Sequence, residues 1–219
     1  MNSSSDIPPT PGVELGPREE SEPEGDWPYR KAVGSLMRLS TMTRPDIPNA
    51  VRVVVRHSYN PTDSHWKVVL KRMAYLHETR GMGITFVTGS GLDLTAYSDA
   101  DYADKSNDMR SVSGTVITLA GAAFSWASSR QRCVTSSTAE AEYVALGEGV
   151  KEALCTGAVL SFISPELSGS CIRVFMDNET AIALAENPLC SAGSKHVDVR
   201  FQFVRELLRG YFVRRRFAV

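Results

Sequence analysis

The segment that most constrains the fold is a strand-like stretch that ends in two acids. Small and apolar residues alternate with others from Gly91 onward, and a period of two predicts a β-strand. The stretch closes with Tyr97–Ala103, which contains Asp99 and Asp101. Aspartate disfavours strands, and an unpaired buried carboxylate is costly. A bound cation explains the acids, so we expect other segments of the chain to supply its remaining ligands.

The residues after this stretch predict an α/β domain with the element order βββαβααβ. The further strands are predicted at Ser113–Leu119, Ala122–Ala127, Cys171–Met176 and Tyr211–Val219, and the helices at Ala139–Phe162, from Thr180 to Asn187, and at His196–Arg209. Gly121 suits a tight hairpin turn. Strands joined through a helix are usually parallel, so we expect a mixed sheet with its first strand beside its fourth. Ligands bind at the carboxyl ends of strands in such sheets, where Asp99 and Asp177 lie.

A third acid is predicted on the first helix of this domain. Glu140 and Glu142 are two residues apart, so they point to nearly opposite sides of the helix. The residues on the side of Glu142 are small or apolar, namely Ala145, Leu146, Gly149 and Ala153. The residues on the side of Glu140 are Tyr143, Gly147, Glu148 and Lys151. The helix dipole favours an N-terminal acid such as Glu140, whereas Glu142 is predicted to face the sheet.

Asp99, Glu142 and Asp177 therefore form a predicted carboxylate triad. Oxygen ligands of this kind suit Mg²⁺ or Mn²⁺. Two such ions can activate a water molecule and stabilise the leaving oxygen in phosphodiester hydrolysis. Asp101 gains no such partners and is expected to lie at the rim of the site.

The N-terminal part of the chain has a different character. Residues 1–26 are rich in Ser, Pro, Gly and Glu and are predicted to be a disordered leader, because they lack the apolar surface to offset the entropy of ordering. Residues 27–84 predict a three-helix segment that is interrupted before Pro45, since the residue preceding a proline is pushed out of the α region. Residues 85–219 form the predicted α/β domain.

Charge and cysteine usage narrow the function only slightly. The net charge of −1 indicates no partner, although the segment Lys195–Val219 is basic, which fits nucleic acid binding and equally a solvated helix face. The four cysteines form no CxxC pair, which indicates a reducing compartment and no zinc site. No apolar run reaches ~18 residues and the acidic N-terminus is unlike a secretory signal, so no membrane partner is expected.

Five motifs resemble, in order and spacing, the ribonuclease H domain of copia-type LTR retrotransposon Pol polyproteins. They are Tyr97–Ala103, Arg110–Gly114, Ser136–Leu146, Asp177–Ile182 and Lys195–Arg200. The segment Tyr29–Gly83 resembles the thumb and connection region just upstream in the same polyprotein. The motifs that carry this second resemblance are Val33–Leu36, Thr43–Ile47, and Asn60–Thr62 followed by His65–Lys67.

The resemblance implies a ribonuclease H-like fold, with a five-stranded mixed sheet flanked by helices and preceded by a small helical segment. It implies endonucleolytic cleavage of RNA in RNA–DNA hybrids with two Mg²⁺ ions, or with Mn²⁺. Asp99 resembles the catalytic acid that the family carries on its first strand. Glu142 resembles the family's catalytic acid on the helix, and Asp177 resembles the one on the fourth strand. Ser113, Ser137 and Asn178 are candidate contacts with the substrate. Implied partners are the hybrid and the reverse transcriptase domain of the same polyprotein, in the cytoplasm or nucleus and, in the family, in virus-like particles.

Two departures from the family pattern suggest an alternative. The family carries a fourth acid after the last strand, whereas here Arg214–Arg216 precede the final residues, so we expect a domain truncated at its C-terminus, with weak activity biased to Mn²⁺. Asp198 is a nearby acid, but its predicted place at a helix start favours a role at the helix N-terminus over a role as a metal ligand. The paired aspartates of a polymerase palm are also missing from this sequence. The alternative to a ribonuclease H is a catalytically impaired Pol fragment that binds nucleic acid without cleaving it.

Overall fold

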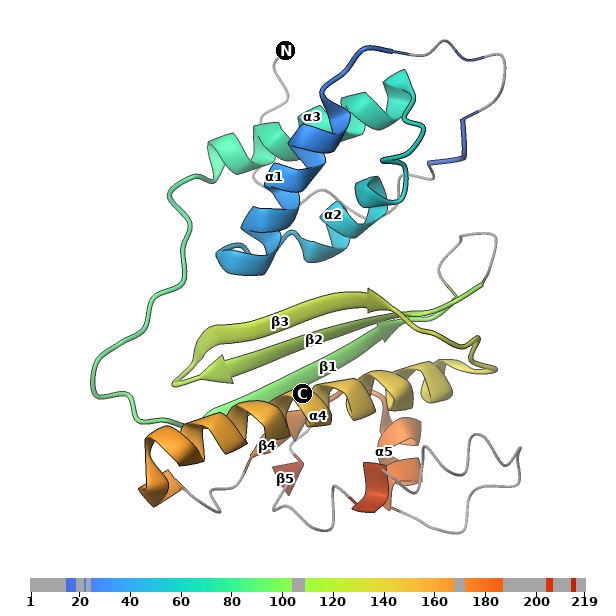
Figure 1. The fold of residues 1–219 in the computed structure, drawn as a ribbon. Coiled ribbons are helices and arrows are strands. Elements are labelled where there is room, and N and C mark those ends of the chain that lie inside the picture. Colours follow the sequence, from blue (N-terminus) through green and yellow to red (C-terminus); the bar gives the residue numbers. More distant parts are fainter. Residues whose placement is uncertain are drawn as a thin grey trace. The chain divides into compact units, whose positions relative to one another are not determined.

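The computed structural model describes residues 15–18, 22, 25–103, 109–167, 172–186, 204–206 and 214–215. Two compact units are present, a helical unit, Met1–Ile84, and an α/β unit, Thr85–Val219 (Figure 1). Each unit has a core of its own. Among the described residues, no helix is both long enough and apolar enough to cross a membrane.

The helical unit contains the three helices expected from the sequence. They are α1 (Tyr29–Met42), α2 (Pro48–Val55) and α3 (Asp63–Glu78). α1 ends two residues before Arg44 and Pro45, as the proline rule predicts. The side chains buried between the helices are Tyr29, Val33, Leu36, Ile47, Val51, Val54, Val68, Val69 and Tyr75.

Part of the predicted leader is anchored on this unit. Leu15 packs against the helical core, and the Gly16 carbonyl lies 3.0 Å from His65 Nε2. The Arg18 guanidinium donates to Asn60 Oδ1 at 2.7 Å. The prediction that all of residues 1–26 are disordered is therefore wrong for residues 15–18, which pack on the helical unit.

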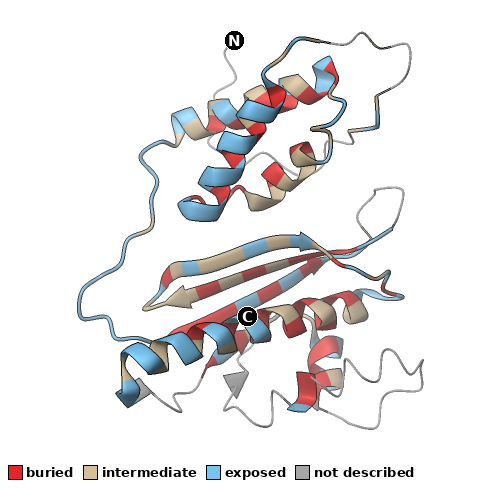
Figure 2. Ribbon diagram, viewed as in Figure 1, coloured by how far each residue is buried: buried red, intermediate tan, exposed pale blue. Residues whose placement is uncertain are grey.

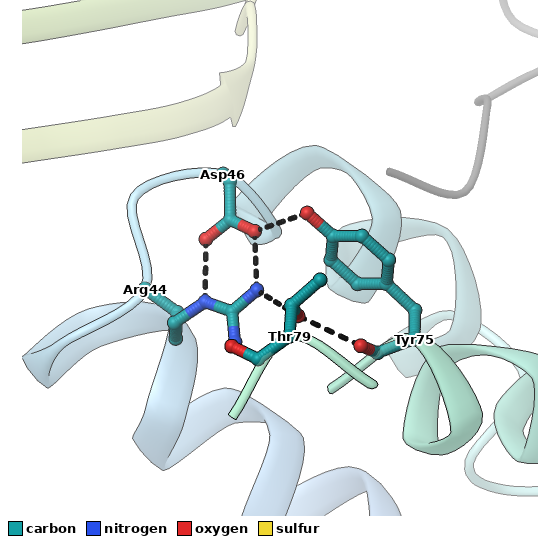
Figure 3. Close-up of polar contacts among 4 residues, drawn as sticks. All are labelled: Arg44, Asp46, Tyr75 and Thr79. Carbon is teal, nitrogen blue, oxygen red and sulfur yellow. Dashed lines mark hydrogen bonds and ion pairs between the residues drawn. The ribbon is translucent and has the colours of Figure 1, made fainter. Parts of the chain in front are cut away.

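A polar network ties the α1–α2 connection to the end of α3 (Figure 3). The Arg44 guanidinium donates two hydrogen bonds to the Asp46 carboxylate, at 2.8 and 2.6 Å, and also contacts Thr79. The Tyr75 hydroxyl donates to Asp46 at 2.7 Å. Burial by itself raises the pKa of Asp46, but the hydrogen bonds from Arg44 and Tyr75 outweigh burial, and the net pKa is lowered. Every partner that this carboxylate needs is supplied by its own unit.

The α/β unit is built on a mixed sheet. Its elements are β1 (Leu94–Asp101), β2 (Val112–Leu119), β3 (Ala122–Arg130), α4 (Thr138–Ile163), a 3₁₀ turn η1 (Pro165–Leu167), β4 (Arg173–Phe175), α5 (Glu179–Glu186) and β5 (Arg214–Arg215). The strand order is β3-β2-β1-β4-β5. The first three strands form an antiparallel meander, and β4 pairs in parallel with both β1 and β5. The expected pairing of the first and fourth strands is confirmed, although β4 has only three residues and β5 only two.

The β2–β3 connection is the tight hairpin predicted at Gly121. Only Ala120 and Gly121 separate the strands, and both have a positive φ, of 53° and 81°. Two-residue turns with positive φ at both positions match the right-handed twist of the flanking strands. The glycine adopts this conformation without the strain that a side chain brings.

The predicted helix His196–Arg209 and the last predicted strand are described only in part. Residues 204–206 are helical, and the Arg205 guanidinium donates to the Leu184 carbonyl in α5 at 3.0 and 3.1 Å. Residues 214–215 form β5. The Lys195–Arg200 motif and Asp198 lie outside the described residues.

α4 covers one face of the sheet (Figure 2), and buried residues of this helix share a hydrophobic core with residues of the strands. Its approach is close because the facing residues are small. A Cβ added at Gly149 meets the Cβ of Ser98 on β1 at 3.4 Å. Ala141 and Ala145 of α4 pack on Ala100 of β1. The N-terminal turns of α4 are thereby held against the carboxyl end of β1.

Candidate metal centre

Two of the predicted acids come from neighbouring parallel strands. Residues alternate along the second half of β1, so that Tyr97, Asp99 and Asp101 are exposed while the residues between them are buried. Tyr97 pairs with Phe175 of β4. Asp99 and Asp177 each follow this pair by two residues, which brings them to the same edge of the sheet because parallel strands run in the same direction.

The third acid comes from α4, on the side that the sequence predicts. Glu142 is buried, with 4% of its surface exposed. Glu140 instead accepts hydrogen bonds from the backbone and hydroxyl of Ser136, at 2.6 and 2.8 Å, just before the helix. As predicted, Glu142 therefore faces inward and Glu140 lies at the start of the helix.

The three carboxylates converge on one point. Each of Asp99, Glu142 and Asp177 offers an oxygen, and these oxygens lie within 4.8 Å of one another. The two aspartates are exposed and the glutamate is buried. Asp101, two residues from Asp99 on the same strand, is outside this group. The expectation that it has no place among the ligands agrees with this geometry.

Among the described residues, the groups that shift the pKa of Glu142 by their charge are the other two acids of the cluster. The pKa of Glu142 is raised to about 7, chiefly by burial. The negative charges of Asp99 and Asp177 and a side-chain hydrogen bond with Asp99 also raise it, while a hydrogen bond from the Ala100 backbone opposes the rise. Glu142 Oε2 is buried and has no hydrogen-bond partner in the described part of the chain. A buried carboxylate oxygen without a donor is unfavourable.

These residues fit a hard divalent cation. All of the available ligand atoms are carboxylate oxygens, which Mg²⁺ and Mn²⁺ prefer. The orphaned Oε2 of Glu142 supplies an acceptor that a cation satisfies, and two exposed aspartates leave the other side open to solvent. An arrangement of this kind can bind a cation and present it to a phosphodiester.

The three predicted substrate contacts have structural partners. Ser113 is buried, and its hydroxyl takes a hydrogen bond from Gln131 at 3.1 Å. Ser137 precedes α4 and accepts from the Glu140 backbone at 3.2 Å, and Asn178 accepts from the Ala181 backbone at 2.9 Å. The last two residues therefore cap α4 and α5 beside the acids. Ser113 faces the interior, which gives it a packing role in place of the predicted contact.

A buried polar group next to the acids was missed by sequence reasoning. Gln131, Ser111 and Thr135 are all less than 4% exposed. Ser111 Oγ lies 2.9 Å from Thr135 Oγ1 and accepts from the Ala103 backbone at 3.1 Å. Ala103 has a φ of 49°, a left-handed conformation that this contact helps to hold after β1. No structural role for these three side chains was predicted from the sequence, because alternation and helical periods say nothing about polar residues outside the elements.

The strand order and the acidic edge define a ribonuclease H-like domain. Among solved structures, the chain resembles the foamy viral protease-reverse transcriptase dRH in complex with dsDNA, with a TM-score of 0.51, 11% identity, and coverage of 90% of this chain and 33% of that one. It also resembles LC11-RNase H1 from a compost metagenome, with a TM-score of 0.43, 17% identity, and coverage of 57% and 84%. No family model matches the chain.

Relatives in sequence specify the protein further. The Retrovirus-related Pol polyprotein from transposon TNT 1-94 of Nicotiana tabacum is 40% identical over 181 residues, which is 83% of this chain and 13% of that protein. The corresponding polyprotein from transposon RE2 of Arabidopsis thaliana is 34% identical over 177 residues, or 81% and 12%. Over most of its length the chain is related to a segment of the retrovirus-related Pol polyproteins of transposons, and it spans about an eighth of the length of these relatives.

A shorter relative matches over most of its own length. The secreted RxLR effector protein 161 of Plasmopara viticola is 39% identical over 127 residues, which is 58% of this chain and 89% of that protein. Segments of this kind thus occur both within long polyproteins and as most of a short protein.

Proposed function

We propose that this chain is a retroelement-derived ribonuclease H that cleaves the RNA strand of RNA–DNA hybrids endonucleolytically, using two Mg²⁺ ions or Mn²⁺. The observation that carries the proposal is the carboxylate cluster. Three acids from β1, α4 and the end of β4 place oxygens within 4.8 Å of one another, and the buried one has an orphaned oxygen. Retroelement ancestry supports a nucleic acid substrate.

The chain's own residues would divide the work as follows. Divalent ions, when bound, activate water and stabilise the leaving oxygen of a phosphodiester. Asp99 and Asp177 would hold them from the exposed side, and Glu142 would hold them from the buried side. Positive charge at this place would offset the burial and the negative neighbours that raise the pKa of Glu142, so this residue would release its proton to solvent. Asp101 stays at the rim.

Recognition of the hybrid would rest on shape and on the RNA strand's hydroxyls. A helix with one RNA strand presents a wide, shallow minor groove with 2′-hydroxyls, which identify that strand. The exposed edge that holds Asp99 and Asp177 faces this groove in the proposed complex. A reverse transcriptase domain of the same polyprotein is the proposed source of the hybrid, inside the cell.

A hybrid-cleavage assay tests the proposal. The full chain is incubated with a labelled RNA–DNA hybrid and Mg²⁺ or Mn²⁺, beside the double variant Asp99→Asn, Asp177→Asn. The matched control is Asp101→Asn, which removes an exposed acid from the same strand but from outside the cluster. We expect cleavage by the parent and by the control, and none by the double variant.

The outcomes separate the enzyme from the alternative. Absence of cleavage by the parent with either metal contradicts the enzymatic proposal. Retention of the hybrid by the parent in a mobility-shift assay, without cleavage, supports an impaired Pol fragment that binds nucleic acid. Cleavage that survives in the double variant places the active site elsewhere.

A further inference from the structure

Gln131 connects three elements and contacts the residue that precedes Glu142. It follows β3, and its backbone amide donates to the Ser111 carbonyl at 2.9 Å. Its side-chain amide, 1% exposed, donates to Ser113 Oγ on β2 at 3.1 Å and to the Ala141 carbonyl in α4 at 2.9 Å. Both N–H groups of the amide are thus used, one on the sheet and one on the helix.

The orientation of the amide is determined by its partners. The Ala141 carbonyl can only accept, so the nitrogen of Gln131 and not its oxygen must face it. Ala141 directly precedes Glu142, and its own side chain packs on Ala100, the residue after Asp99. Ala100 pairs with Ser113 in the β1–β2 ladder. The contact therefore links the backbone beside Glu142 to the strand register beside Asp99.

A restraint is needed at this place because the three carboxylates repel one another. Like charges within a few ångströms favour any movement that separates them. Asp99 lies on the paired strand β1 and Asp177 follows β4 by two residues, whereas Glu142 lies in α4, which is not hydrogen-bonded into the sheet ladder. A Lys or Arg in this position would restrain the helix but would also pair with the acids and compete with a cation. A neutral amide donor restrains the helix without cancelling the charge that attracts the metal.

We infer that Gln131 is a positioning residue that holds α4 against β2, so that Glu142 stays in the geometry required for binding a divalent cation with Asp99 and Asp177. The inference rests on the proposed metal-binding function. Gln131 does not touch the cation or the substrate; it acts through the Ala141 carbonyl. Residues that orient metal ligands in this way typically affect metal affinity by about 10–100-fold.

The test measures Mn²⁺ binding to the full chain by titration calorimetry, in the absence of nucleic acid. Gln131→Leu removes both donors at similar side-chain volume. The matched control is Val150→Ala, which removes buried methyl groups from the same helix about 12 Å from Glu142 and lowers stability without altering the contact. We expect Mn²⁺ affinity to fall about tenfold or more in Gln131→Leu and to stay within about twofold of the parent in Val150→Ala.

A second variant separates positioning from folding. Ser113→Ala leaves Gln131 in place with one acceptor removed, and we expect a smaller loss of Mn²⁺ affinity, of about threefold. In the double variant Gln131→Leu, Ser113→Ala, the loss should equal that of Gln131→Leu alone, because the serine acts only through the glutamine. If Gln131→Leu does not fold, the loss of Mn²⁺ affinity in the single variant Ser113→Ala, which keeps Gln131, carries the test.

The results that overturn the inference are distinct from those that overturn the proposed function. A folded Gln131→Leu variant that binds Mn²⁺ as tightly as the parent shows that Gln131 does not position Glu142. The same conclusion follows if Val150→Ala loses as much affinity as Gln131→Leu, or if Ser113→Ala leaves affinity unchanged. A parent that binds no Mn²⁺ overturns the metal site itself, and the role of Gln131 with it. Tight Mn²⁺ binding without hybrid cleavage contradicts only the enzymatic proposal.

Discussion

Each unit contains a carboxylate that is at least partly buried, and the surroundings shift the pKa values of the two carboxylates in opposite directions. In the helical unit, Asp46 is surrounded by donors from Arg44 and Tyr75, which hold its pKa below the ordinary value despite burial. In the α/β unit, Glu142 is buried beside two other acids, and its pKa is raised to about 7. The first acid stabilises the fold by itself. The second has an unfavourable environment that a cation would relieve, and this difference distinguishes a structural carboxylate from a candidate ligand.

The largest expected effect comes from removing the charge of Glu142. Glu142→Gln should reduce hybrid cleavage by about a hundredfold, because losing a charged ligand should cost at least as much as losing a residue that only orients one, which costs about 10–100-fold. In EDTA the same variant should be no less stable than the parent, because a neutral amide relieves the repulsion from Asp99 and Asp177. Cleavage assays and urea denaturation measure the two effects. If the Glu142→Gln variant is active but less stable than the parent, Glu142 stabilises the fold, as Asp46 does, and is not a metal ligand.

Asp46→Asn should have the opposite profile. The substitution leaves the Arg44 guanidinium, which is 7% exposed, without its anionic partner, so the helical unit should lose about 2–3 kcal/mol of stability. Asp63→Asn is the matched control, since its ion pair with Lys67 is solvent-exposed and should matter by less than about 0.5 kcal/mol. Urea denaturation compares the two variants. Equal losses would show that the network in Figure 3 contributes no more than a surface pair.

Divalent cations should stabilise one unit only. A cation present at about 100 times its dissociation constant stabilises the state that binds it by about 2.7 kcal/mol. Hydrogen exchange measured by mass spectrometry with and without Mn²⁺ should show slower exchange in β1 and α4 and no change in α1–α3. The double variant Asp99→Asn, Asp177→Asn should show no slowing in either unit. Protection that appears instead in the helical unit contradicts the proposed location of the cation.

The smallest expected effect is an opposite dependence on pH. The folded pKa of Glu142 is raised from 4.5 to about 7, so in EDTA its contribution to the stability of the α/β unit is present below pH 4.5 and is lost as the pH rises through 7. Burial and the neighbours His65 and Arg56 lower the pKa of His57 from 6.5 to about 4. The contribution of His57 to the stability of the helical unit is present above pH 6.5 and is lost as the pH falls toward 4.

Hydrogen exchange at pH 5 and pH 7, corrected for intrinsic rates, resolves the two trends. The variants Glu142→Gln and His57→Gln should each abolish the trend in their own unit and leave the other unchanged. Parallel trends in the two units would mean that neither group controls the dependence on pH.

Local patterns were sufficient for most of the elements and for the choice of acids. Alternation indicated β1 and the acids at its end, Gly121 indicated the hairpin turn, and the helical period separated Glu142 from Glu140. These features depend on residues a few positions apart, so the sequence contains them directly. β4 was predicted twice as long as it is, because apolar residues beyond its three paired positions do not reveal where pairing stops.

The sequence by itself determined that Asp99 and Asp177 lie at the ends of strands. It also determined that the side of α4 that carries Glu142 faces the sheet. Only the tertiary structure decided that Asp99 and Asp177 follow the Tyr97–Phe175 pair by the same two residues, that Ser113 is interior, and that Gln131 holds the helix beside Glu142. The physical reason is that burial, hydrogen bonding and the pKa of an acid depend on groups brought together from distant parts of the chain, whereas periodicity reports only the side of an element on which a residue lies.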